Sequence, residues 1–485
     1  MVKKNNTKKR KFNNNICDNN MTFDDCELAI LRQAVDESEK LQGLKKVNND
    51  DIQKMLKIVE DFIISKKLVC YGGTAINNIL PKYAQFYKRD IEIPDYDFFS
   101  ADALNDAKEL ADIYFKEGYT DVEAKSGVHY GTFKVFVNYI PIADITYLNK
   151  QIYDTISKEA IQIAGIKYAP PNYLRMSMYL ELSRPAGDVS RWEKVMKRLA
   201  ILNKYYPLQM KKNCSTIDFS KKIDLNTDEN QKLHLSIRDA FVNQGVIFFG
   251  GYSTYLYSKH MSESKRDLVN KIPDFDVLSE DIDKCALIIK EQLQREKYKQ
   301  IKCIKHDAIG EIIPRHIEIK VGDRSMAFIY EPIACHSYNI INIENMEVKV
   351  ATIDTILAFY LSFMYANMPY YDKDRLLCIA MFLYHVEERN RLEQKGILKR
   401  FSIDCYGKQS TLEDMRSEKS EKYKELQKNK NKTEYEMWFL RYAPNDNKKD
   451  IQEDADEKII KKRVTKKNKT QKKRNNIIDM IRKGI

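Results

Sequence analysis

Glycine is scarce in this sequence, with 16 residues in a chain of 485. Two places nevertheless carry adjacent glycines, Gly72-Gly73 in YGGTAINNIL and Gly250-Gly251 in FGGYSTYLYS. Each pair lies between a short apolar run and a segment with helical spacing. Without Cβ atoms, the backbone of such a turn can take positive φ and approach a ligand closely, just before a helix N-terminus. The first pair is therefore a candidate phosphate-binding turn.

Other absences narrow the class of protein. The nine cysteines include no Cys-x-x-Cys pair, which predicts reduced thiols in a cytosol-like compartment. Cys303, His306 and His316 are too loosely spaced for a zinc site, so we expect an ordinary strand edge there. No basic start runs into an apolar stretch, and we expect a protein that is not secreted. The most apolar window, 355–368, is too short to cross a bilayer and predicts a buried helix.

The net charge of +12 is concentrated near the two ends of the sequence. Residues 3–11 carry six Lys or Arg and residues 458–474 carry ten, in both cases without an acidic residue. Removing these sixteen charges would change the net charge from +12 to −4. Nucleic-acid affinity is therefore expected from local patches or from these ends rather than from the body. Solvated tails, polyanion tethers and nuclear-targeting segments all remain open for the two runs.

The chain repeats its own organisation. IPDYDFFS at 93–100 follows the first glycine pair, and IPDFDVLS at 272–279 follows the second. The spacing from second glycine to first aspartate is 22 residues in one copy and 23 in the other. A capped helix and an apolar strand precede each glycine pair, the strands at 68–71 and 246–249. The repeat predicts two α/β modules of the same build.

Composition and pattern divide the chain into five expected segments. They are a basic tail with a helical segment at 1–45, a catalytic module at 46–167, a helical linker with substrate-binding residues at 168–235, a degenerate second module with helices at 236–440, and a basic disordered tail at 441–485.

Three aspartates of the first copy suggest metal-assisted chemistry. Asp95 and Asp97 are two residues apart on an expected strand, so their carboxylates share one face while Tyr96 points the other way. Asp144, at the end of the strand pattern GTFKVFVNYIPIADITY, would supply a third carboxylate. Carboxylate oxygens suit Mg²⁺ or Mn²⁺, and a pair of such ions supports in-line transfer of a nucleotide with release of pyrophosphate.

The remaining candidates would hold the triphosphate. Gly72 and Gly73 would present backbone N–H groups, and the Thr74 hydroxyl would lie where a phosphate oxygen sits. Arg191 and Lys194, in line with Arg198, follow one side of a predicted helix. This row is either a solvated face or a basic wall for the triphosphate or a substrate backbone.

The second copy keeps part of this pattern. Aligning Pro-Ile-Ala-Cys with Pro-Ile-Ala-Asp puts Cys335 in the place of Asp144, which removes a hard oxygen ligand. We expect this module to be structural or nucleic-acid-binding, with a thiolate-assisted second site as the alternative. The retained residues are Gly250, Gly251, Ser253, Asp274 and Asp276.

These motifs, with YLRMSMYLELSRPAGDVSRWEKV at 173–195, resemble the poly(A) polymerase catalytic subunits of poxviruses, asfarviruses and giant viruses. The resemblance covers roughly residues 50–400. It implies a polymerase β-like nucleotidyltransferase module followed by a degenerate second one, and a transferase that adds adenylates from ATP to mRNA 3′ ends. By the matching motifs, the triphosphate would lie on Gly72, Gly73 and Thr74, and the metals on Asp95, Asp97 and Asp144.

The resemblance also implies partners and location. RNA 3′ ends and ATP would be the substrates, with either a separate processivity subunit or a homodimer, and no membrane. Such a protein would act in viral factories of the host cytoplasm and be carried in the virion. Three alternatives use the same motifs: a non-catalytic RNA-binding scaffold, a terminal transferase for another nucleotide, and a small-molecule nucleotidyltransferase. The carboxylates act on phosphates and do not select the base.

Overall fold

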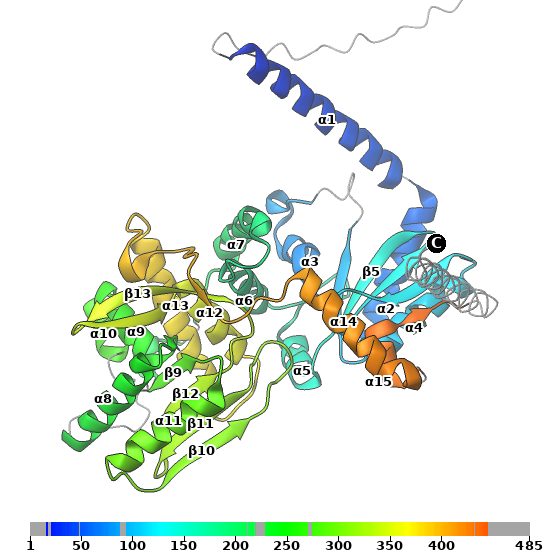
Figure 1. Ribbon diagram of the computed structural model, residues 1–485. Helices are drawn as coiled ribbons and strands as arrows, with labels where there is room; N and C mark the ends of the chain where they lie inside the picture. Colours follow the sequence, from blue (N-terminus) through cyan, green and yellow to red (C-terminus); the bar gives the residue numbers. More distant parts are fainter. Residues whose placement is uncertain are drawn as a thin grey trace, which may run out of the picture.

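The computed structural model describes residues 16–17, 21–47, 49–87, 94–210, 212–217, 219, 228–269, 274–430 and 432–444. Most of these residues form two α/β modules that lie side by side, while α1 (Phe23–Val47) projects away from the first module (Figure 1). The basic runs 3–11 and 458–474 lie outside the described residues.

The first module is built on an eight-stranded sheet with the order β16-β3-β4-β5-β2-β1-β7-β6. Helix α2 illustrates how the sequence forms it: Asn49 caps the helix by accepting from the Asp51 N–H, and one helical face is buried as its spacing predicts. The strands are β1 (Val69–Cys70), β2 (Tyr96–Ser100), β3 (Val122–Ser126), β4 (Thr132–Val137), β5 (Ile140–Tyr147), β6 (Ile161–Ile163), β7 (Ile166–Tyr168) and β16 (Arg441–Tyr442). The helices are α2 (Asp50–Lys66), α3 (Gly72–Ile79), α4 (Ala103–Lys116) and α5 (Lys150–Glu159).

The second module has a sheet of the same size, with the order β10-β11-β12-β9-β8-β14-β13-β15. Its strands are β8 (Ile247–Phe248), β9 (Phe275–Leu278), β10 (Ile301–His306), β11 (His316–Val321), β12 (Arg324–Tyr330), β13 (His336–Ile343), β14 (Met346–Ala351) and β15 (Cys405–Tyr406). Its helices are α8 (Asp228–Asn243), α9 (Gly251–Tyr257), α10 (Glu263–Val269) and α11 (Ile282–Arg295).

The two sheets match strand for strand. The run β3-β4-β5-β2-β1-β7-β6 corresponds to β10-β11-β12-β9-β8-β14-β13. The directions match as well, since β2 and β5 pair in parallel as β9 and β12 do, and β1 and β2 are antiparallel as β8 and β9 are. The predicted fold class, two α/β modules of one build, is confirmed. Each sheet adds one strand of its own, β16 or β15.

Equivalent helices join the modules. Helix α6 (Pro171–Leu182) follows β7, α12 (Ile353–Phe363) follows β14, and the two helices pack against each other. Every residue of α12 is buried, as predicted for the apolar window. Helices α7 (Trp192–Tyr205) and α13 (Lys373–Arg389) follow them in turn.

The C-terminal described segment returns to the first module. Helices α14 (Leu412–Leu426) and α15 (Thr433–Phe439) lead to β16, which pairs with the edge strand β3. Lys419 of α14 donates to the Gly127 carbonyl at 2.9 Å, and Glu436 of α15 forms an ion pair with Lys108 at 2.8 Å. These contacts place α14, α15 and β16 against the first sheet. The sequence instead predicts that residues 236–440 belong to the second module.

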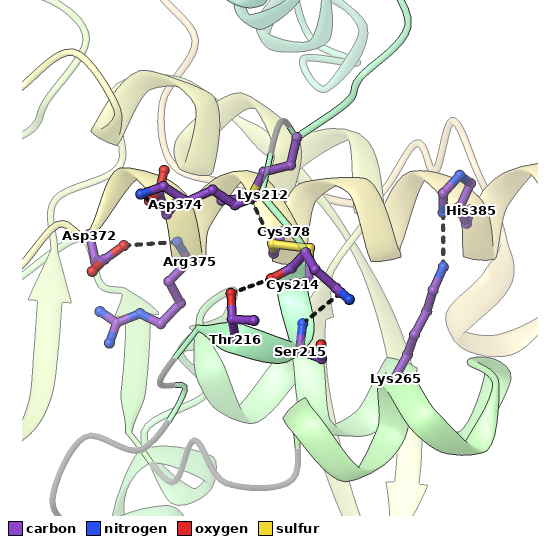
Figure 2. Close-up of a disulfide and its surroundings, with 12 residues drawn as sticks. Lys212, Cys214, Ser215, Thr216, Lys265, Asp372, Asp374, Arg375, Cys378 and His385 are labelled. Atoms are coloured by element: carbon purple, nitrogen blue, oxygen red, sulfur yellow. Dashed lines mark hydrogen bonds and ion pairs between the residues drawn. A yellow bond between two sulfur atoms is a disulfide. The ribbon is translucent and has the colours of Figure 1, made fainter.

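The cysteines correct one expectation. Six of the nine form disulfides, Cys17–Cys26, Cys214–Cys378 and Cys335–Cys405, so the prediction of reduced thiols throughout is wrong. Figure 2 shows the Cys214–Cys378 bond, which ties the segment after α7 to helix α13. Partners far apart in the chain cannot be recognised from cysteine spacing.

Two further predictions from the sequence concern a strand edge at Cys303, His306 and His316 and the absence of a membrane-spanning segment. Cys303 is exposed and lies with His306 on the edge strand β10, as predicted. His316, the register partner of His306 with a stacked ring, is instead buried on the inner strand β11, so the strand-edge prediction is wrong for this residue. Across the described ranges, no helix combines the length and the apolar character needed to span a bilayer.

Candidate active site

The three predicted aspartates lie on one face of the first sheet. Asp97 of β2 and Asp144 of β5 are direct register partners on neighbouring parallel strands. Asp95 immediately precedes β2 and, two residues from Asp97, projects to the same side. Tyr96 points to the opposite face, where it is buried and donates to Glu60 of α2. The alternation of β2 therefore brings the carboxylates together.

The pKa values of Asp95 and Asp97 are raised in part because the three carboxylates lie close together. Burial first, and then the charges of Asp95 and Asp144, raise the pKa of Asp97 to about 7. Burial and then the charge of Asp144 also raise the pKa of Asp95 above its ordinary value. Carboxylates that repel each other in this way are stabilised by a cation placed among them.

A basic residue that the motifs did not identify completes the cluster. Lys134 of β4 is the register partner of Asp144, and its ammonium group forms an ion pair with Asp144 Oδ2. Its charge also lowers the pKa values of Asp95 and Asp97, against the stronger opposing effects. No motif marks this lysine, because its place depends on the register between β4 and β5.

The first glycine of the turn makes room for a carboxylate of its own module. Gly72 has φ +71°, and a Cβ there would lie 2.9 Å from Asp97 Oδ2. In the second module, a Cβ on Gly250 would lie 1.8 Å from Asp276 Oδ2. Both glycines therefore serve the contact between turn and aspartate, in addition to any ligand contact.

The second glycine faces an arginine. A Cβ on Gly73 would lie 2.7 Å from Tyr87 Oη and 2.8 Å from Arg198 Nη2. Arg198 of α7 donates to the Tyr87 hydroxyl, and its guanidinium lies 5.4 Å from the centre of the Phe86 ring. Asn77 of α3 fixes this loop, because its side-chain oxygen accepts from the Phe86 and Tyr87 N–H groups at 2.8 Å each. A positive charge is thus held directly at the turn.

The other two residues of the predicted basic row, Arg191 at the N-cap of α7 and Lys194 on α7, have different surroundings. Arg191 forms an ion pair with Glu181 at 3.1 Å, and Lys194 is exposed. Of the predicted basic row, Arg198 is the member that reaches the Gly-Gly turn.

Thr74 has a role that the sequence did not suggest. Its buried hydroxyl donates to the Asp95 carbonyl oxygen at 2.7 Å, which ties the start of β2 to helix α3. The hydroxyl therefore positions a carboxylate-bearing residue in this structure.

The second module differs from the first at the position that corresponds to Asp144. The register partner of Asp276 is Phe328 of β12, so Phe328 and not Cys335 takes the place of Asp144. Cys335 lies beyond β12 and is bonded to Cys405. The shared Pro-Ile-Ala motif suggested the alignment of Cys335 with Asp144, and the sheet register shows that this alignment is wrong. The cavity beside Asp276 is lined by Tyr330, Tyr360, Phe363, Tyr370, Tyr371 and Arg375, among others.

The donor set of the first module suits a hard divalent ion. In the described part of the chain, no three or more His, Cys, Asp or Glu side chains are already grouped as a metal site. Asp95, Asp97 and Asp144 nevertheless offer only oxygen donors, and they share a face on which negative charges repel one another. These features fit Mg²⁺ or Mn²⁺ rather than a softer metal.

Carboxylates on adjacent strands beside a Gly-Gly turn are typical of nucleotidyltransferases, and the comparisons with known proteins agree. Residues 57–188 match the family model of the poly(A) polymerase catalytic subunit. That stretch contains the turn and all three aspartates, and it confirms the resemblance seen in the sequence.

Two viral relatives and one solved structure extend this result. A protein of African swine fever virus (isolate Tick/Malawi/Lil 20-1/1983), named as a poly(A) polymerase catalytic subunit, is 34% identical over 170 residues, which cover 34% of this chain and 35% of that protein. A protein of the same name from Acanthamoeba polyphaga mimivirus is 29% identical over 225 residues, 44% of this chain and 36% of that protein. The matches thus span little more than a third of either relative. The Megavirus polyadenylate synthase structure shares the fold, with TM-score 0.72, 20% identity, and coverage of 90% of this chain and 88% of that one.

Proposed function

We propose that this protein is a template-independent poly(A) polymerase, which adds AMP from ATP to the 3′ ends of mRNA and releases pyrophosphate. The observation that carries the proposal is the register between Asp97 and Asp144, with Asp95 beside them, at a Gly-Gly turn. The family match over residues 57–188 supports the choice of adenylate and of RNA.

Two groups of residues in the first module would have separate roles, one in binding metal ions and one in binding the triphosphate. Asp95, Asp97 and Asp144 would hold Mg²⁺ or Mn²⁺. Such ions, when bound, favour deprotonation of an attacking hydroxyl and stabilise charge on phosphate oxygens. Gly72 and Gly73 would let the triphosphate approach the backbone at the start of α3.

Arg198 would be the main basic contact of the triphosphate. Its guanidinium is held beside Gly73 by Tyr87 and Phe86, so little side-chain entropy is lost when it binds a phosphate. Arg191 and Lys194 would extend this basic surface along α7. In the reaction, a bond forms between the RNA 3′ oxygen and the α-phosphorus while the bond from that phosphorus to the pyrophosphate oxygen breaks.

The second module would be structural or would bind RNA. Phe328 removes the third carboxylate, and aromatic side chains line the cavity beside Asp276. The relatives' name, catalytic subunit, is consistent with a separate processivity subunit, and a homodimer is the other arrangement that we consider. The viral relatives favour action in the cytoplasm of an infected host.

A primer-extension assay tests the proposal. The full-length protein is incubated with an RNA oligonucleotide, Mg²⁺ or Mn²⁺, and ATP, UTP, CTP or GTP in separate reactions. We expect extension with ATP, and its loss in the Asp95→Ala/Asp97→Ala variant with RNA binding retained. No extension by the wild type, or a preference for another nucleotide, would reject the proposed activity. Unchanged extension by the double variant would reject the proposed site.

A further inference from the structure

Lys134 is placed beside a proposed metal-binding carboxylate. It lies on β4 opposite Asp144, and its ammonium group contacts the carboxylate oxygen Oδ2. The lysine side chain is 39% exposed and the aspartate side chain 19% exposed, so the pair lies at the edge of the site and is partly shielded from water. The same ammonium group acts favourably on the charges of Asp95 and Asp97.

The second module provides an internal comparison. Lys134 pairs in register with Asp144, and the equivalent pair in the second module is Glu318 with Phe328. The lysine and the carboxylate are therefore absent together from the module in which the acid cluster is incomplete. Glu318 has other partners, since it accepts from Ser325 and lies 3.4 Å from His306. This joint difference ties Lys134 to the acid cluster rather than to the fold that both modules share.

We propose that Lys134 is a positioning residue that serves as the counter-ion of Asp144 in the metal-free protein and competes with a divalent ion for that carboxylate. The inference depends on the proposed function, because it assumes that the three aspartates bind the metal. An ammonium group and a divalent ion on the same carboxylate repel each other strongly where water is partly excluded. Each therefore weakens the binding of the other, and the coupling is reciprocal.

This arrangement has two consequences. Without metal, Lys134 limits the repulsion among the three aspartates and fixes the orientation of the Asp144 carboxylate. With metal, the ammonium group must move from Asp144 Oδ2, and its release lowers the net affinity for the ion. Lys134 thus lowers the affinity of the site for metal and stabilises the site when metal is absent.

Removal of the charge tests the proposal in the full-length protein. Mn²⁺ binding to wild type and to Lys134→Met is measured by calorimetry, and melting temperatures are recorded in EDTA and in saturating Mn²⁺. We expect Lys134→Met to bind Mn²⁺ roughly tenfold more tightly. We also expect it to melt several degrees lower in EDTA, with most of that loss recovered in Mn²⁺. Lys134→Arg, which keeps the charge, should bind Mn²⁺ with an affinity near that of the wild type.

A neighbouring lysine offers a matched control. Lys125 of β3 is the register partner of Lys134, has a similar 42% side-chain exposure, and pairs with Glu123 instead of a site aspartate. Lys125→Met should leave Mn²⁺ affinity unchanged. If Lys134→Met folds poorly, the Asp144→Asn background gives a second measurement, because there the loss of Lys134 should cost no stability in EDTA.

The outcomes separate the two claims. Unchanged or weaker Mn²⁺ binding by Lys134→Met, or an equal loss of melting temperature in EDTA and in Mn²⁺, would overturn the role of Lys134 and leave the proposed function standing. Failure of the wild type to bind Mn²⁺ at all would reject both.

Discussion

Phe328 in the second module takes the register position that Asp144 takes in the first. The surrounding strands have the same order and directions in both modules, so the exchange of a carboxylate for a phenyl ring is a local difference within a common frame. In the described part of the chain, the first module thus pairs Asp97 with a carboxylate and the second pairs Asp276 with a phenyl ring, so each module can serve as a control for the other.

The first prediction compares equivalent aspartates. Asp97→Asn should lower the rate of adenylate addition by more than roughly a hundredfold, because it removes a proposed ligand of the ion that stabilises charge in the transition state. Asp276→Asn, the same change in the second module, should leave the rate within about twofold. Rates are compared by single-nucleotide addition at saturating ATP, with folding checked by circular dichroism. A large loss in Asp276→Asn would contradict the view that the second module is not catalytic.

The second prediction concerns triphosphate binding. Arg198→Ala should raise KM for ATP by about tenfold or more, since a guanidinium held next to Gly73 loses its charge-assisted hydrogen bonds to phosphate. Arg191→Ala should have a smaller effect, because Arg191 is paired with Glu181. Steady-state kinetics with varied ATP measures both variants. Equal effects of the two substitutions would point to a diffuse basic surface rather than a specific contact.

The third prediction concerns the glycines next to the aspartates. Gly72→Ala combines a left-handed backbone with a Cβ only 2.9 Å from Asp97 Oδ2, so we expect a stability loss of about 1–2 kcal/mol and a large loss of activity. Gly118→Ala is the control, because Gly118 also has positive φ but open space around it. Urea unfolding gives both stabilities. If the two variants lose activity equally, crowding of Asp97 is not the cause.

Much of the fold could be predicted because its signals are local. Ile52, Met55 and Val59 recur at helical spacing and are buried on one face of α2, and the alternation of Asp95, Tyr96 and Asp97 predicts two carboxylates on one side. The duplicated Gly-Gly and Pro-Asp motifs predicted two modules of one build, and the matching strand orders confirm this.

What could not be predicted depends on contacts between distant segments. Lys134 was not identified because its place opposite Asp144 depends on strand register, and the same register shows that Phe328 replaces the third acid. Arg198 stood in a row of three basic residues, and only the packing of α7 against the loop at Tyr87 distinguishes it. The return of residues 412–442 to the first module likewise has no local signal.

The fourth prediction concerns the long-range disulfide. Cys214–Cys378 closes a loop with a sequence separation of 164 residues and ties the segment after α7 to α13. In the loop-entropy model, a cross-link of this length stabilises the folded state by about 5 kcal/mol. Cys214→Ser should therefore lower the melting temperature under non-reducing conditions and make it less sensitive to dithiothreitol. Peptide mapping without reductant checks that the bond is present in the wild type. An unchanged melting temperature would show that this bond contributes little.

The fifth prediction is a pH dependence that arises in the second module. The pKa of His316 is lowered to about 4, chiefly by burial and to a smaller extent by the charge of His306, whereas the Pro314 carbonyl and Glu318 oppose the shift. The neutral ring is well accommodated, because Nδ1 lies 3.0 Å from the Pro314 carbonyl, to which it can donate, and Nε2 lies 2.7 Å from the Tyr370 hydroxyl, from which it can accept.

In the unfolded chain, His316 takes up a proton near pH 6.5, whereas in the folded chain it does so only near pH 4. The unfolded state therefore binds more protons between these values, and stability falls as the pH falls from 6.5 to 4. At pH 5 the loss from this residue should be about 2 kcal/mol relative to pH 7.5. Urea unfolding of wild type and His316→Gln at both pH values measures it, and the variant should lose correspondingly less. His129→Gln, at an exposed histidine, should behave as the wild type does. An equal pH dependence in His316→Gln and the wild type would assign the acid sensitivity to other groups.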